Sequence, residues 1–276
     1  MRNGAAAIVL CFLCGPAIPS ARPRPSPATA GPHANLRLIA DESTLEPGRD
    51  LDLGLLFDLE PHWHIYWINP GDSGEPPSVT WKLPGGFQAM DLEWPAPERL
   101  VNGPITDYGY QGRVLLIAPV RVPSTIKEHD VAFSAEVRWL VCSDVCISEK
   151  ADVSVELPVE RVRIEADVQS RGLFQVARRR LPQPLPRNWR VSIEDEGKTF
   201  RIRLNTGARI RQASFFPLEF DQVDNAQPQN AVPLASGVEV DVQKSDQLLK
   251  PLQELKGVLV IDGDRAYQVT APVKRG

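Results

Sequence analysis

The stretch from residue 131 to residue 159, VAFSAEVRWLVCSDVCISEKADVSVELPV, decides the fold. Its apolar side chains occupy alternate positions before the two cysteines and again after them: Val131, Phe133, Ala135, Val137, Trp139, then Val153, Val155, Leu157 and Val159. A period of two is typical of a strand with one buried face. The stretch therefore predicts two long strands that meet near the cysteines.

Cys142 and Cys146 fall on the polar side of this alternation, so we expect both sulfur atoms to face away from the main core. In one unbroken strand their Cα atoms would be about 13 Å apart, at roughly 3.3 Å per residue, whereas a disulfide needs less than about 7 Å. The chain must therefore turn at residues 143–145. This predicts a hairpin with one cysteine on each arm.

Short apolar runs separated by turn residues continue through most of the 276-residue chain, which holds 26 prolines and 19 glycines. Such spacing predicts many short strands, and seven before residue 160 suggest a sandwich. The fold class is mostly β, with a second, smaller β domain after the sandwich. The expected strands of the sandwich are 35–40, 50–59, 63–68, 78–83, 114–122, 131–141 and 151–159.

Four segments are predicted: a signal peptide and proline-rich leader (1–30), the sandwich (33–160), a helix and proline-rich linker (161–187) and the second β domain (188–276). The leader has Arg2 before a short apolar run, and cleavage is expected after Ala21 or Ala30. Cleavage would remove Cys11 and Cys14 together with the leader. The mature chain is then a periplasmic protein with no membrane span and a single thiol pair in an oxidising compartment.

Three uses of that pair stay open. As a structural staple it closes a very short loop, which contributes only about 2 kcal/mol. As an exposed pair it suits thiol exchange, because attack on sulfur needs access. With His62 and His64, which share one strand face, it could form a non-catalytic Cu(I) or Zn(II) site or a binding module. The net charge of -4, without a long basic run, indicates no nucleic-acid partner.

Three stretches carry a resemblance to a known family: WLVCSDVCISEKADVSVELPV, HWHIYWINPGDSGEPPSVTWKLPGGF and PITDYGYQG. They resemble the N-terminal exported domain of the DsbD/ScsB thiol:disulfide interchange (protein-disulfide reductase) family. The resemblance implies an immunoglobulin-like fold and a catalytic pair at Cys142 and Cys146. It also implies a cap loop at Asp107, Tyr108 and Tyr110, which shields the sulfurs until a partner docks.

The family resemblance further implies that the pair relays electrons without a cofactor. The expected partners are a membrane-embedded DsbD/CcdA-like electron donor and exported thioredoxin-fold acceptors. This chain departs from the family in its narrower C-x-x-x-C spacing and in Ser148, where similar relatives often have proline. Family members also continue into transmembrane helices and a thioredoxin domain, whereas this chain ends at Gly276, so we expect a free-standing version.

Overall fold

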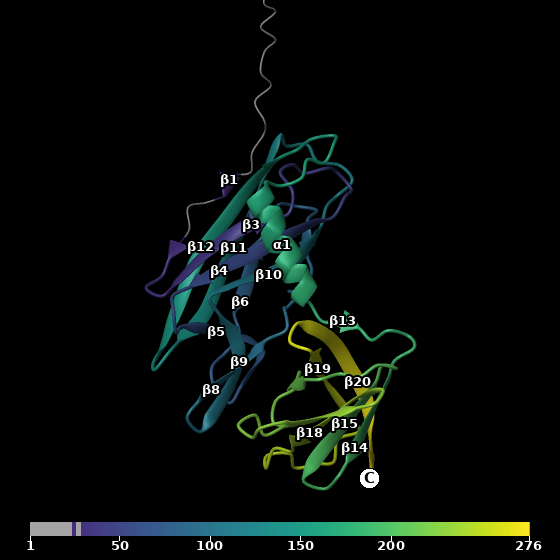
Figure 1. The fold of residues 1–276 in the computed structure, drawn as a ribbon. Coiled ribbons are helices and arrows are strands. Elements are labelled where there is room, and N and C mark those ends of the chain that lie inside the picture. Colours follow the sequence, from purple (N-terminus) through teal and green to yellow (C-terminus); the bar gives the residue numbers. More distant parts are fainter. Residues whose placement is uncertain (1–23, 26–28, 276) are drawn as a thin grey trace, which may run out of the picture.

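The computed structural model describes residues 24–25 and 29–275, with side chains from residue 31 onward (Figure 1). Most of the predicted leader, including Cys11 and Cys14, lies outside the described residues. Strands make up most of the described chain, alongside one α-helix, so the predicted mostly-β class is confirmed. Within residues 24–25 and 29–275, no helix has the length and apolarity needed to cross a membrane.

Two sheets form the sandwich. The first has the order β1-β12-β11-β5-β9-β8, with β6 beside β11. Its strands are β1 (Arg24–Pro25), β5 (His64–Gly71), β6 (Ser78–Lys82), β8 (Glu98–Asn102), β9 (Ile105–Gln111), β11 (Asp130–Cys142) and β12 (Cys146–Pro158). The second has the order β2-β3-β4-β10-β7. Its strands are β2 (Thr29–Ala30), β3 (Ala34–Ala40), β4 (Leu51–Leu59), β7 (Gln88–Ala89) and β10 (Arg113–Arg121).

The alternation around the cysteines places one face of β11 and β12 in the core between the sheets. The five apolar side chains of β11, from Val131 to Trp139, are all buried there with the facing leucines of β3 and β4. Trp139 packs edge-on against Phe57 of β4, with ring centroids 5.5 Å apart. The predicted strand pattern is confirmed for both arms of the hairpin.

Helix α1 (Val168–Arg180) covers the outer face of the second sheet (Figure 1). Asp167 caps its first turn, where its Oδ1 accepts hydrogen bonds from the backbone N–H groups of Gln169 and Ser170. Phe174 is buried against this sheet, and a Cβ on Gly54 of β4 would lie only 2.9 Å from the Phe174 ring. Glycine at this position lets the helix approach the strand closely.

A third sheet forms the second body of the molecule, in the order β16-β19-β20-β14-β15-β18-β17, with β13 beside β20. Most of its core forms a cluster of its own, while Phe216, Val258 and Ala266 pack with the sandwich core. The short β13 shows that part of the proline-rich segment is hydrogen-bonded to the second body. The strands are β13 (Gln183–Pro184), β14 (Arg190–Asp195), β15 (Thr199–Asn205), β16 (Ala213–Pro217), β17 (Asn230–Leu234), β18 (Gly237–Gln243), β19 (Glu254–Ile261) and β20 (Arg265–Arg275).

The two bodies pack directly against each other through Phe216 of β16. Its ring packs edge-on against the rings of Trp67 and Tyr108, with centroid distances of 6.3 Å and 5.2 Å. Beside it, the buried side chain of Asn69 donates a hydrogen bond to the carbonyl of Pro217 at 2.8 Å. The second body therefore contacts β5 and β9, two strands of the first sheet.

Candidate functional site

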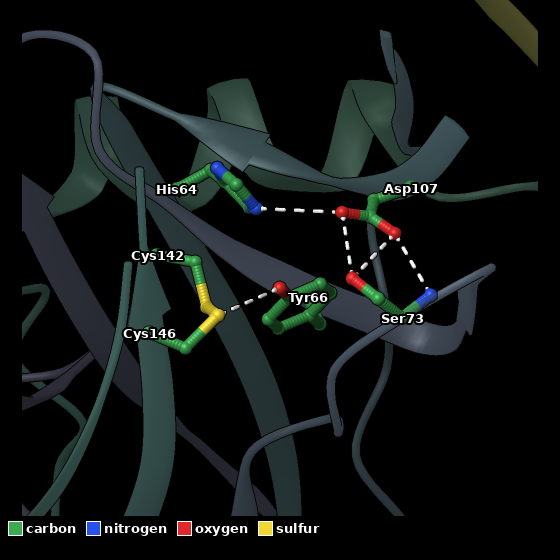
Figure 2. The surroundings of a disulfide bond; sticks show 6 residues. All are labelled: His64, Tyr66, Ser73, Asp107, Cys142 and Cys146. Atoms are coloured by element: carbon green, nitrogen blue, oxygen red, sulfur yellow. Dashed lines mark hydrogen bonds and ion pairs between the residues drawn. A yellow bond between two sulfur atoms is a disulfide. The ribbon is translucent and has the colours of Figure 1, made fainter. Parts of the chain in front are cut away.

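A disulfide between Cys142 and Cys146 closes the tip of the β11–β12 hairpin (Figure 2). The two cysteines lie opposite each other at the end of the strand pair, with Cα atoms 4.1 Å apart and sulfur atoms 2.07 Å apart. The N–H of Ser143 donates to the carbonyl of Val145 at 3.0 Å, which completes the turn. The predicted hairpin, with one cysteine on each arm, is confirmed.

The two sulfur-bearing residues differ in exposure. Cys146 is exposed, whereas Cys142 is only 1% exposed, although it belongs to none of the apolar clusters. Neither cysteine belongs to the apolar core, in line with the expected orientation, but the interpretation of the pair as exposed is wrong for Cys142. The reason is a further strand: the end of β5 pairs with β11 at this point, so that His64 lies opposite Cys142. Cys142 is thus an interior position of the sheet.

Strand β5 carries two aromatic side chains to the disulfide. Ile65 and Trp67 face the core, and the alternate positions His64 and Tyr66 face the sulfurs (Figure 2). The Tyr66 hydroxyl lies 3.6 Å from Cys146 Sγ, and the rings of His64 and Tyr66 meet edge-on at 5.1 Å. Pairing between strands distant in sequence brings them there, and no local pattern signals it.

Asp107 lies behind His64 and is 3% exposed. Its Oδ1 accepts hydrogen bonds from the backbone N–H and the hydroxyl of Ser73, both at 2.9 Å. Its Oδ2 is 3.9 Å from Nε2 of His64, a buried nitrogen for which the described residues provide no hydrogen bond. Burial raises the pKa of Asp107 and lowers the pKa of His64. The site therefore favours a neutral imidazole beside the disulfide.

The loop 71–77 packs on the ring of Tyr66. Gly74, in the left-handed region with φ of 79°, lies so close that a Cβ there would be 2.1 Å from the ring. Only a residue without a side chain fits flat against the phenol in this backbone conformation. The ring thus lies between the loop and Cys146, so that Tyr66 and the loop together cover one side of the disulfide.

Residues 37–158 match the family model described as "Thiol:disulfide interchange protein DsbD, N-terminal". This segment is a DsbD N-terminal domain. Over 89% of this chain and 95% of the other, the fold is similar to the N-terminal periplasmic domain of ScsB from Proteus mirabilis, with a TM-score of 0.65 and 19% identity. A search of curated proteins found no match. The sandwich is accordingly an immunoglobulin-like domain of the thiol:disulfide interchange type.

The predicted cap residues of the DsbD N-terminal domain lie in strand β9, between β5 and β8, instead of in a loop. Because side chains alternate along a strand, Asp107 faces the disulfide side while Tyr108 and Tyr110 face the core, where both are buried. The hydroxyl of Tyr108 donates to Asn225 at 2.9 Å, and that of Tyr110 to the carbonyl of Pro95 at 2.6 Å. The period of two in residues 105–111 was the signal that could have revealed this strand.

A groove of about 410 Å³ runs beside the disulfide of this domain. Its walls include His62 and His64 on one side, Arg99 and Val101 of β8 on another, and Ser143 of the cysteine turn. Val101 is 68% exposed and Val145, in the same turn as Ser143, is 63% exposed. The turn between the two cysteines therefore borders an open groove, and Val101 and Val145 are solvent-facing apolar side chains near it.

The two histidines predicted to share a strand face do not do so. His62 precedes β5 in a turn with φ of 70°, so the alternation begins only at His64. In the part of the chain that the structure describes, no three His, Cys, Asp or Glu side chains are grouped as metal ligands would be. A soft-metal site would need both cysteines reduced, and it stays a prediction.

Proposed function

We propose that the chain is an exported thiol:disulfide interchange protein that relays electrons through Cys142 and Cys146. The observation that carries this proposal is the asymmetry of the disulfide: Cys146 is exposed at the end of a turn that borders an open groove, and Cys142 is buried opposite His64. Exchange needs one accessible sulfur to attack and one leaving thiolate to be kept in place. The DsbD N-terminal match supports the same chemistry.

Reduction of the disulfide starts at Cys146. A thiolate of the electron donor attacks Cys146 Sγ, the bond to Cys142 breaks, and Cys142 leaves with the electron pair and takes up a proton. The donor's second thiolate then attacks the donor's sulfur in the mixed disulfide, and Cys146 leaves as a thiolate that takes up the second proton lost by the donor's thiols. Two electrons and two protons have moved to this chain, and the donor is oxidised to a disulfide.

Delivery to the acceptor reverses these roles. The Cys146 thiolate attacks the acceptor's disulfide, one acceptor sulfur leaves as a thiolate, and Cys142 resolves the mixed disulfide by attacking Cys146 Sγ. The acceptor gains two electrons, and the Cys142–Cys146 bond forms again. The Tyr66 hydroxyl, 3.6 Å from Cys146 Sγ, is placed to donate a hydrogen bond to the thiolate.

The cover over the sulfurs is proposed to be Tyr66 with the loop 71–77, held through Ser73 by Asp107. Asp107 thereby keeps its predicted place in the cap. Tyr108 and Tyr110 support it from the core side of β9. A docking partner would move Tyr66 aside and fill the neighbouring groove.

The proposed partners are a membrane-embedded DsbD/CcdA-like donor and exported thioredoxin-fold acceptors in the periplasm. Support comes from the cysteine content, because after loss of the predicted leader the chain would hold only Cys142 and Cys146. One thiol pair can pass on two electrons but cannot generate them. A donor and an acceptor besides this thiol pair are therefore required.

The test is to trap the mixed disulfide in cells that export the chain. Cys142→Ala leaves the exposed Cys146 without its resolving partner, so it is expected to accumulate covalent adducts that mass spectrometry identifies. Cys146→Ala is the matched variant, and its buried Cys142 is expected to form far fewer adducts. No adduct with either variant, or equal yields from both, would contradict the proposed exchange at Cys146.

A further inference from the structure

A loop of the second body, residues 218–229, contacts the disulfide domain through the side chain of Asn225. Asn225 Oδ1 accepts a hydrogen bond from the Tyr108 hydroxyl at 2.9 Å, and its Nδ2 donates to Asp72 Oδ1 at 2.9 Å. Arg99 of β8 fixes the backbone of the same loop, donating to the carbonyl of Asn225 at 2.6 Å and to that of Gln227 at 3.0 Å. Both ends of the Asn225 amide are therefore used across the boundary between the bodies.

Asp72 connects Asn225 to the cover of the disulfide. Its Oδ2 accepts a hydrogen bond from the N–H of Thr106 at 2.7 Å, which ties the loop 71–77 to β9. The next residue, Ser73, donates to Asp107, and Gly74 packs on the ring of Tyr66. Three consecutive residues thus link Asn225 to the phenol whose hydroxyl contacts Cys146.

The second body also holds the beginning of this loop. Asn69 donates from Nδ2 to the carbonyls of Pro217 and Glu219, at 2.8 and 3.3 Å, while its Oδ1 accepts from the N–H of Gly71 at 3.1 Å. The loop 71–77 is therefore attached to the second body at Asp72, and the end of β5 just before the loop is attached at Asn69. A body that served only as a spacer would not need contacts to both positions.

We propose that Asn225 is a positioning residue, through which the second body holds the loop 71–77 and Tyr66 over Cys146 and so limits the rate of thiol attack on the disulfide. This assigns a role to the second β domain in the exchange reaction. The inference rests on the proposed function for its biological meaning, but its physical content is the accessibility of Cys146, which a small thiol can measure without any protein partner.

The test is the second-order rate at which dithiothreitol reduces the Cys142–Cys146 bond in the full exported chain, followed by thiol-alkylation mass shifts. Asn225→Ala removes the hydrogen bonds to Asp72 and Tyr108, and it is expected to react about fivefold faster, the factor that one lost hydrogen bond typically gives. Asn225→Asp keeps an acceptor for Tyr108 but turns a carboxylate toward Asp72. Its rate is expected to rise at least as much.

Two control variants separate positioning from general destabilisation. Asn205→Ala makes the same truncation in an exposed turn of the second body, where the side chain accepts only from the N–H of Gly207. Ile202→Val weakens the buried core of β15 and is expected to lower the melting temperature. Both are expected to react at the rate of the unaltered protein.

Unchanged rates in both Asn225 variants would overturn the inference, as would a rise in Ile202→Val equal to that in Asn225→Ala. Neither result depends on trapping a partner in cells. The failure of this inference and the failure of the proposed function are therefore distinguishable.

Discussion

Two polar clusters, one at the disulfide and one at helix α1, differ in composition and in how their charges are compensated. The disulfide cluster consists of His64, Tyr66, Ser73 and Asp107. The helix cluster, at α1 on the second sheet, consists of Asp41, Glu42, Asp52, Arg163 and Arg178. In the helix cluster each carboxylate meets a guanidinium, and Arg178 Nη2 lies 2.7 Å from Asp41 Oδ2. In the disulfide cluster, Asp107 accepts hydrogen bonds from Ser73, and Nε2 of His64 lies 3.9 Å from Asp107 Oδ2.

The comparison teaches that a shifted pKa does not by itself mark a reactive site. Burial raises the pKa of Asp41 in the helix cluster and of Asp107 in the disulfide cluster, in both cases as the main cause. What separates the clusters is the partner: an arginine that fixes a helix in one, a hydroxyl and an unprotonated imidazole beside a disulfide in the other. The first arrangement holds the helix to the sheet, and the second matches the exchange site proposed at the disulfide.

The largest expected effect is on stability, in the helix cluster. Arg178→Met keeps much of the side-chain packing on Phe174 but leaves Asp41 and Asp52 without this cation, so unfolding should become easier by about 2 kcal/mol, a value reduced because Arg178 is partly exposed. Urea denaturation measures it. Arg179→Met, an exposed neighbour, is the control. If Arg178→Met also changed the rate at which dithiothreitol reduces the disulfide, the two clusters would be coupled, contrary to this comparison.

Asp107→Asn should change stability in the opposite direction to Arg178→Met. It removes a buried carboxylate that lacks a cation, so the variant is expected to be more stable at pH 7 by about 1 kcal/mol. Because the folded pKa of Asp107 is raised, the folded protein binds the proton more tightly, and the stabilising effect of that proton is lost as pH rises from about 3.8 through the folded value. The advantage of the variant should therefore vanish near pH 3.5.

The measurement for Asp107→Asn is urea denaturation from pH 3.5 to pH 8. Asp144→Asn, an exposed position in the cysteine turn, is the control. If Asp107→Asn is less stable at every pH, the hydrogen bonds from Ser73 to the carboxylate contribute more to stability than burial of the carboxylate costs.

Tyr66→Phe tests which phenol contacts the sulfur. Loss of the hydroxyl at Cys146 should change the dithiothreitol reduction rate about threefold, the size expected for one weak hydrogen bond to sulfur. Tyr110→Phe should lower stability by about 1 kcal/mol, because it loses the bond to the carbonyl of Pro95, and leave the rate unchanged. A changed reduction rate in Tyr110→Phe with an unchanged rate in Tyr66→Phe would mean that β9 shields the disulfide.

The smallest effect concerns His64. Burial lowers its pKa in the folded protein, so below about pH 6.5 the unfolded chain binds more protons and the folded state loses stability. The stability of His64→Gln relative to the unaltered protein should therefore increase as pH falls from 7 to 5, by less than about 1 kcal/mol. The exposed His129→Gln is the control. A loss in His64→Gln would mean that protonated His64 pairs with Asp107.

The sequence predicts the hairpin well because alternation and cysteine spacing are local. It predicts the rest of the site poorly for physical reasons. The position of His64 opposite Cys142 depends on strand pairing between distant segments, and the alternation of residues 105–111 is short and interrupted by Gly109. The contact of Gly74 with Tyr66 depends on a turn that only the folded domain defines. No local pattern carries these contacts.

The contact of Asn225 with Asp72 is the clearest case, since it joins two bodies that each have a core of their own. Sequence patterns locate strands and their buried faces, but they do not say how two finished domains meet. The role proposed for the second body could be reached only from the structure.

The most direct test of the central claim is the equilibrium of the Cys142–Cys146 bond with glutathione buffers in the native protein. An exchange site should be reduced reversibly, with a potential above about −300 mV, and the reduced protein should keep its cooperative unfolding with a loss of no more than about 2 kcal/mol. A bond that resists reduction until the chain unfolds, or a potential below that value, would show a structural staple and contradict the account.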